Sequence, residues 1–161
     1  MTLVRRARPE DAPAVTGLIG ELGYATETDD VRDRIAGLPA GHVVLVATDG
    51  ERLTGWLQAR HGLSLVHGER LEIVGLAVSR DWRGRGVGGV LVDAAERWAL
   101  DRGLGSAQVL SGSERAAAHR FYARRGYRRV KSEQVFVKAL TADRAWAGQG
   151  IPPDSLDTPA L

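Results

Sequence analysis

Apolar residues recur along the chain at two spacings, which together predict alternating helices and strands. Helical spacing predicts four helices, over residues 9–23, 26–38, 87–102 and 113–127. Shorter runs rich in β-branched residues predict strands over residues 2–7, 42–60, 69–79, 106–112 and 128–140. The 42–60 run is a hairpin of two strands, because the Asp49-Gly50 pair is a strong turn signal. The predicted order is therefore β-α-α-β-β-β-α-β-α-β.

Local residue preferences mark several helix ends and one buried strand. Pro9 lies near the first helical position of the 9–23 helix, where proline is favoured. Ser113 is the expected N-cap of the last helix, and Gly126 lies at its C-cap position. The 69–79 run is nearly continuous in its apolar residues and holds Glu72 among them, which predicts a central strand covered on both faces.

The composition is that of an ordinary globular protein, and it excludes several classes of site. The chain has 161 residues, of which 43% are hydrophobic, and this suits a single domain. Cysteine is absent, which excludes disulfides, thiolate metal sites and a cysteine nucleophile. The four histidines are scattered without zinc spacing, so we expect no metal. No apolar run reaches eighteen residues and the N-terminus lacks a secretory signal, so we expect a cytoplasmic protein without membrane contact.

The charge of the chain does not favour nucleic-acid binding. The net charge is only +2, and acidic helices balance the arginine-rich last helix, so nucleic-acid binding is not expected.

A change in composition separates one domain from a C-terminal tail. We expect the domain over residues 1–140. Residues 141–161 are rich in Pro, Gly and Asp, which predicts a tail that is either loosely ordered or part of an interface.

A glycine-rich turn with two arginines lies between the 69–79 strand and the next helix. Its residues are Arg83, Gly84, Arg85, Gly86, Val87, Gly88 and Gly89. The letters fit the dinucleotide pattern G-x-G-x-x-G, but the turn lies in mid-chain and the five residues SRDWR separate Val78 from Gly84. Glycines that bend the backbone at a helix N-terminus, beside positive charge, predict an anion site instead. The alternative is a flexible turn with solvated arginines.

Two separated motifs resemble the GNAT acetyltransferase superfamily. In the segment RGRGVG, Arg83, Gly86 and Gly88 occupy the fixed positions of Gln/Arg-x-x-Gly-x-Gly/Ala, the acyl-CoA signature of that family. The segment AHRFYARRGY is similar to the family's closing helix. The resemblance covers residues 3–140 and implies an α/β (α+β) fold, in which helices flank a mixed, mostly antiparallel sheet splayed between its fourth and fifth strands. It also implies that the protein is a homodimer that transfers the acetyl group of acetyl-CoA to a primary amine in a ternary complex.

The resemblance assigns roles to residues of this chain. The backbone of Leu76, Ala77 and Val78 would pair with the pantetheine arm, the turn from Arg83 to Gly89 would hold the pyrophosphate, and Ser113 and His119 would contact the cofactor. Tyr122 would contact the cofactor and protonate the leaving thiolate, as its phenol pKa near 10 suits. Glu72 is the candidate base, because burial would raise its pKa toward neutrality. The alternative is that Glu72 is paired with an arginine.

The acceptor is expected at the first two helices and the loop between them, where Glu21, Tyr24, Glu27 and Asp29 predict binding of a small cationic amine. These acidic residues are also what a solvated helix start prefers. An anionic amine, as in the aminoalkylphosphonate acetyltransferases that the last helix also resembles, would need arginines such as Arg32, Arg34 or Arg60. Transfer to a protein or peptide, and a non-catalytic acyl-CoA sensor, stay open as alternatives.

Overall fold

The computed structural model describes residues 1–112, 115–138 and 140, which fall into two compact units. The first unit holds residues 1–109, and the described residues from 110 onward belong to the second. All five strands and the first three helices lie in the first unit.

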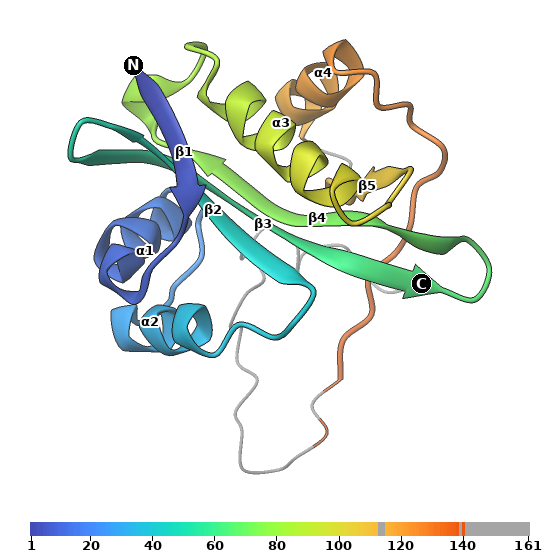
Figure 1. Ribbon diagram of the computed structural model, residues 1–161, viewed down its shortest axis with the longest axis horizontal. Helices are drawn as coiled ribbons and strands as arrows, with labels where there is room; N and C mark the ends of the chain where they lie inside the picture. The colour runs from blue at the N-terminus through green and yellow to red at the C-terminus, as the bar shows by residue number, and fades with distance from the viewer. Residues whose placement is uncertain (113–114, 139, 141–161) are drawn as a thin grey trace. The chain divides into compact units, whose positions relative to one another are not determined.

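The first unit is built on a five-stranded sheet with the strands in chain order (Figure 1). They are β1 (Thr2–Arg6), β2 (His42–Asp49), β3 (Arg52–Ser64), β4 (Gly68–Val78) and β5 (Ala107–Val109). The first four strands pair antiparallel with their neighbours, and β5 alone pairs parallel, with β4. The mixed, mostly antiparallel sheet expected from the sequence is confirmed.

Three helices cover the two faces of this sheet (Figure 1). Two of them, α1 (Ala12–Glu21) and α2 (Thr28–Ala36), pack on one face, where Val15 and Val31 meet Trp56 in an apolar cluster. The third, α3 (Val87–Leu100), covers the other face and buries Leu91 completely. Two short 3-10 turns, η1 (Pro9–Asp11) and η2 (Arg80–Trp82), precede α1 and follow β4. All three predicted helices of this unit are therefore present.

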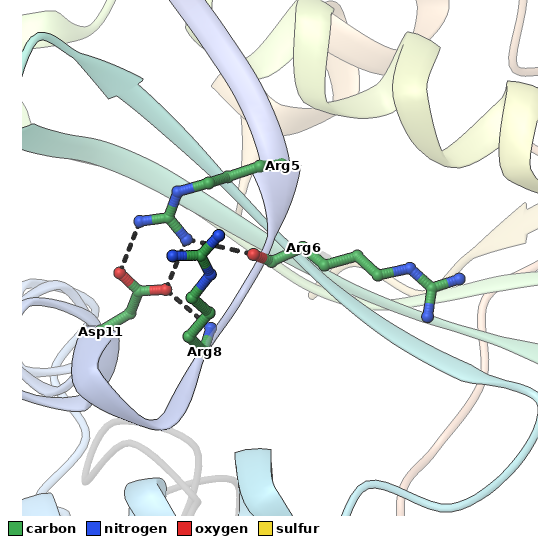
Figure 2. Close-up of polar contacts among 4 residues, drawn as sticks. All are labelled: Arg5, Arg6, Arg8 and Asp11. Carbon is green, nitrogen blue, oxygen red and sulfur yellow. Dashed lines mark hydrogen bonds and ion pairs between the residues drawn. The ribbon is translucent and has the colours of Figure 1, made fainter.

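An ion pair organises the passage from β1 into α1 (Figure 2). The guanidinium of Arg5 donates two hydrogen bonds to the Asp11 carboxylate, at 2.7 and 2.8 Å, and the backbone N–H of Arg8 donates a third at 2.7 Å. These bonds, led by those from Arg5, hold the pKa of Asp11 below its usual value. Three donors to one largely buried carboxylate fix where the chain leaves the sheet and begins the helices.

One irregularity in β4 decides which of its side chains share a face. Gln58 of β3 lies opposite Gly75, but the next residue, Ala59, lies opposite Ile73, so Val74 is an extra residue in β4. Such a bulge shifts the alternation of side chains by one position. Glu72 and Gly75 therefore face the same side of the sheet, the side that α1 and α2 cover, although they are three residues apart.

The second unit contains α4 (Ala116–Arg124), the predicted last helix. Gly126 follows it with φ of 86°, and the N–H of Tyr127 donates to the carbonyl of Tyr122 at 3.0 Å, so the predicted glycine stop is confirmed. The expected cap at Ser113 is wrong, because the N-cap is Arg115; Ser113 itself lies outside the described residues.

The predicted strand over residues 128–140 is also wrong within the part that the structure describes. Residues 128–138 and 140 carry no strand pairing, and Val130, Val135 and Phe136 are exposed. The run is rich in β-branched residues, but β propensity depends on packing against a neighbouring strand, which the run lacks among the described residues. The predicted tail over 141–161 lies outside the described residues.

Candidate functional site

The glycine-rich turn forms an open cradle of backbone N–H groups at the start of α3. Gly84 and Gly86 have φ of 74° and 84°, and an added Cβ at either would meet nothing within 4 Å. Gly86 is the N-cap, and the first helical bond runs from the N–H of Val90 to its carbonyl at 3.1 Å. The N–H groups of residues 87–89 therefore lack an acceptor within the helix. Free donors and the positive end of the helix dipole suit an anion here, as the sequence predicts.

The arginines and acidic groups beside this turn are held in place by specific contacts. Arg83 donates from Nε to the carbonyl of Val78 at 3.1 Å, and its guanidinium lies 3.9 Å from the Glu21 carboxylate. The same carboxylate accepts a hydrogen bond from the backbone N–H of Arg80 at 3.0 Å. Arg85 lies over the ring of Trp82, 5.2 Å from its centre. Glu21, expected at the acceptor, thus contacts the glycine-rich turn, a role that sequence reasoning missed.

Among the described residues of the first unit, the end of β4 next to this turn has a strand partner on one side only, and its other side is called the available edge. Pairing of β4 with β5 covers only Leu71, Glu72 and Ile73, whereas Leu76, Ala77 and Val78 pair only with β3 within the first unit. Extended backbone with unpaired N–H and C=O groups can pair with a ligand as with another strand. The available edge ends at Val78, whose carbonyl accepts from Arg83, so the edge leads directly to the anion cradle.

Glu72 lies between two arginines. Its carboxylate is 2.7 Å from Nε of Arg60 and 3.5 Å from Nε of Arg70, and its side chain is 19% exposed. Gly62 lies on β3 opposite Arg70, and a Cβ there would overlap the Glu72 side chain. Glu72 is therefore paired with arginines, as the alternative interpretation of the sequence expects. A role of Glu72 in proton transfer stays a prediction.

The remaining residues expected to bind the acceptor are only partly available. Asp29 is ion-paired with Arg32 on the first turns of α2, and Asp30 lies 3.9 Å from Arg34. Tyr24 is half-buried and Glu27 is exposed in the loop between α1 and α2. Most of the acidic charge expected to hold a cation is thus compensated by neighbouring arginines.

Tyr122 and His119 belong to the second unit and are described within it. The ring of Tyr122 meets Phe121 and Tyr127 edge-on, with centroids 5.0 and 5.6 Å apart. Burial raises the pKa of the Tyr122 hydroxyl above its usual value. A phenol that stays protonated at neutral pH can donate a proton. The ring of His119 is hydrogen-bonded through Nε2 to the carbonyl of Gly112 at 2.8 Å.

Sequence reasoning missed a pocket of about 340 Å³ between the α1–α2 pair and the sheet. Trp56 and Gln58 of β3 and His42 of β2 contribute to its walls. The signal in the sequence was that Gln58 and Arg60 alternate with the apolar Leu57 and Ala59, which places both polar groups on one face of β3.

Neither a metal-binding cluster nor a membrane-spanning helix occurs in the part of the chain that the structure describes. In residues 1–112, 115–138 and 140 we find no group of three His, Asp or Glu side chains placed to hold a metal ion. Within the same ranges, no helix has the length and apolar character that crossing a membrane requires.

Comparisons with known proteins agree with this geometry. The family model described as "Acetyltransferase (GNAT) family" matches residues 12–127. The aminoalkylphosphonate N-acetyltransferase of Salmonella typhimurium is 32% identical over 143 residues, which cover 85% of this chain and 90% of that protein. A 60-residue stretch, 37% of this chain, is 42% identical to the uncharacterized N-acetyltransferase YhdJ of Bacillus subtilis, of which it covers 42%. The aminoglycoside N-acetyltransferase AAC(6')-Iy, solved in complex with CoA, has a similar fold, with a TM-score of 0.77 at 17% identity over 86% of this chain and 95% of that one.

Proposed function

The chain belongs to the acetyltransferase (GNAT) family, whose relatives act on small amines, and we propose that it transfers the acetyl group of acetyl-CoA to a primary amine by direct attack in a ternary complex. The observation that carries this proposal is the continuous path from the available edge of β4 to the glycine-rich turn. The order of the residues along this path matches the order of the parts of acetyl-CoA. The backbone of Leu76–Val78 would pair with the extended pantetheine arm. The N–H groups and arginines of the glycine-rich turn would then bind the pyrophosphate.

Tyr122 and Glu72 would carry out two proton transfers of the reaction. The amine nitrogen forms a bond to the acetyl carbon while the bond from that carbon to sulfur breaks. Glu72 accepts, through water, one proton from the ammonium group of the acceptor before the attack. Tyr122 donates its proton to the departing thiolate, and the second proton, which the nitrogen loses as the amide forms, passes through solvent to restore the Tyr122 hydroxyl. The Tyr122 hydroxyl is protonated at neutral pH, as this role requires, although the burial that raises its pKa also makes it a weaker acid. The ion pairs of Glu72 would orient its carboxylate for its role as base.

Two classes of acceptor amine, cationic and anionic, are candidates for the substrate. A cationic amine would be held by Tyr24 and Glu27, and the likeness to a protein named as an aminoglycoside N-acetyltransferase favours it. An anionic amine would be held by an arginine, as the relative named as an aminoalkylphosphonate N-acetyltransferase suggests. Since Glu21 and Asp29 already form ion pairs with arginines, these contacts favour the anionic candidate.

We further propose that the protein is a cytoplasmic homodimer. Light scattering on the purified protein tests the assembly, and a mass that corresponds to one chain would contradict it. Fractionation of the cells that make the protein tests the location, and recovery outside the cytoplasm would contradict it.

Thiol release from acetyl-CoA across a panel of small amines, with mass spectrometry of the products, tests the reaction. Gly86→Val should abolish acetyl-CoA binding in calorimetry, because the side chain would enter the cradle. Gly103→Val is the matched control. Gly103 also has a positive φ, 74°, and open space around its Cβ position, but lies after the other end of α3. Equal acetyl-CoA affinity in the two folded variants would contradict the proposed site.

A further inference from the structure

Glu21 is the last residue of α1, a position that does not favour an acidic side chain. The C-terminus of a helix carries the negative end of the helix dipole, which repels a carboxylate. The Glu21 side chain is 31% exposed, so water and salt screen this repulsion only in part. A carboxylate in this place therefore needs a stabilising contact outside its own helix.

That contact is with the short turn η2, which leads from β4 into the glycine-rich turn. The backbone N–H of Arg80, the first residue of η2, donates to the Glu21 carboxylate at 3.0 Å. Ser79, the N-cap residue of η2, makes no capping hydrogen bond with its side chain. Glu21, 59 positions earlier in the chain, thus supplies the acceptor that a capping side chain usually provides. A hydrogen bond to a carboxylate is stronger than one to a neutral acceptor.

The two arginines of the glycine-rich turn are held by contacts that begin at η2. Arg83 follows η2 directly, and its guanidinium lies 3.9 Å from the Glu21 carboxylate while Nε donates to the carbonyl of Val78 at 3.1 Å. Arg85 lies over the ring of Trp82, the last residue of η2, 5.2 Å from its centre. The same oxygen of Glu21, Oε2, therefore bonds the backbone of η2 and lies near Arg83.

A second carboxylate on η2 offers a comparison. Asp81 is paired with Arg52 at the start of β3, at 3.0 Å, and its side chain is 73% exposed. An exposed ion pair of this kind contributes little to stability. Asp81 thus places a negative charge on the same turn, but its ion pair leads to β3 and not to the glycine-rich turn.

We propose that Glu21 is a positioning residue of the donor site, which anchors η2 and holds Arg83 where the pyrophosphate of acetyl-CoA binds. The inference rests on the proposed function, which names acetyl-CoA as the ligand of the glycine-rich turn. It gives Glu21 a role in binding the donor in place of the contact with the acceptor amine that the sequence predicts.

Removal of the Glu21 side chain has two opposite effects on an anion at the glycine-rich turn. Loss of a negative charge beside the turn raises the positive potential there, which by itself strengthens anion binding. Loss of the acceptor for the Arg80 N–H frees η2 to move, which weakens binding because the ligand must then order the turn. The positioning role requires the second effect to dominate, so the sign of the change in affinity decides between them.

Calorimetry with CoA, which lacks the acetyl group, measures donor binding without turnover, and urea unfolding confirms that each variant is folded. Glu21→Ala should weaken CoA binding about tenfold, as expected for loss of one hydrogen bond to a charged group. Glu21→Gln keeps an oxygen acceptor for the Arg80 N–H, so its affinity for CoA should stay within about twofold of the wild type. Asp81→Asn, the matched control, removes a charge from η2 and should also stay within about twofold.

Steady-state kinetics separate a role at the donor site from a role at the acceptor site. Glu21→Ala should raise the KM for acetyl-CoA about tenfold, whereas kcat and the KM for the amine should stay near those of the wild type. A general loss of structure would not change one KM alone. A raised KM for the amine with an unchanged KM for acetyl-CoA would return Glu21 to the acceptor site and overturn the proposal.

The remaining outcomes distinguish this proposal from the proposed function. CoA binding by Glu21→Ala that equals or exceeds that of the wild type would overturn the positioning role. An equal loss of affinity in Glu21→Gln or in Asp81→Asn would overturn the anchoring of η2 through Arg80. CoA binding that depends on Glu21 as stated, without acetyl transfer to any amine, would support the role of Glu21 and contradict the proposed reaction. A wild-type protein that does not bind CoA would overturn both.

Discussion

Gly55 allows β3 and α3 to approach closely, and replacing it by alanine tests whether that approach positions the glycine-rich turn. An added Cβ would lie 2.9 Å from the carbonyl oxygen of Ala77, 3.1 Å from Cγ1 of Val87 and 3.2 Å from Cδ1 of Leu91. The first of these atoms is backbone in a paired strand, so it cannot move aside cheaply. Gly55→Ala should therefore force α3 away from the sheet.

The expected cost follows from the crowding. Overpacking of this kind costs about 1–3 kcal/mol of the free energy of unfolding. For a chain of this size the loss corresponds to a fall in Tm of about 2–12 °C. Because Val87 is the first residue of α3, the displacement should also move the N–H cradle, and the affinity for acetyl-CoA should fall.

The assays are urea unfolding and calorimetry with acetyl-CoA, and Gly17→Ala is the matched control. Gly17 lies exposed in α1 with nothing within 4 Å of an added Cβ. Alanine there should increase the free energy of unfolding by about 0.5–1 kcal/mol. A Gly55→Ala protein as stable as the wild type would refute the close approach. A destabilised variant with unchanged affinity for acetyl-CoA would refute the link to the turn.

Three further substitutions test the proton-transfer groups and the ion pair of Figure 2. Tyr122→Phe keeps the ring contacts and should lower kcat by about 10²–10⁴-fold with unchanged acetyl-CoA affinity, whereas an unchanged kcat in single-turnover measurements would assign the residue to packing. Glu72→Gln should lower kcat, and an unchanged kcat in single-turnover measurements would leave Glu72 only its ion-pair role. The lowered pKa of Asp11 means that its stabilising contribution is complete above about pH 4 and is lost as the pH falls through the folded-state pKa. Asp11→Asn should therefore flatten the acid dependence of unfolding, and an acid transition equal to that of the wild type would count against this contribution.

Local patterns in the sequence were enough to predict most elements and the anion cradle. The helical spacing of apolar residues located α1, α2, α3 and α4, because that spacing reflects one buried face of a single element. Gly84 and Gly86 were identifiable because a backbone with positive φ strongly favours glycine, which shows in the letters themselves. The strand predicted over 128–140 failed because strand formation depends on a partner that the residues of the run do not specify.

Contacts between distant elements were decided by the tertiary structure alone. Glu21 contacts Arg80, 59 positions later, and no local preference relates the two residues. The bulge at Val74 places Glu72 on the face of Trp56 and Gln58, and one residue fewer in β4 would have turned Glu72 to the opposite face. The pairing of Glu72 with Arg60 follows from that register, because strand alternation converts a shift of one residue into a change of face. The sequence pattern of one helix or strand indicates which of its residues are buried. Which polar side chains contact one another depends on how the helices and strands pair in the folded chain.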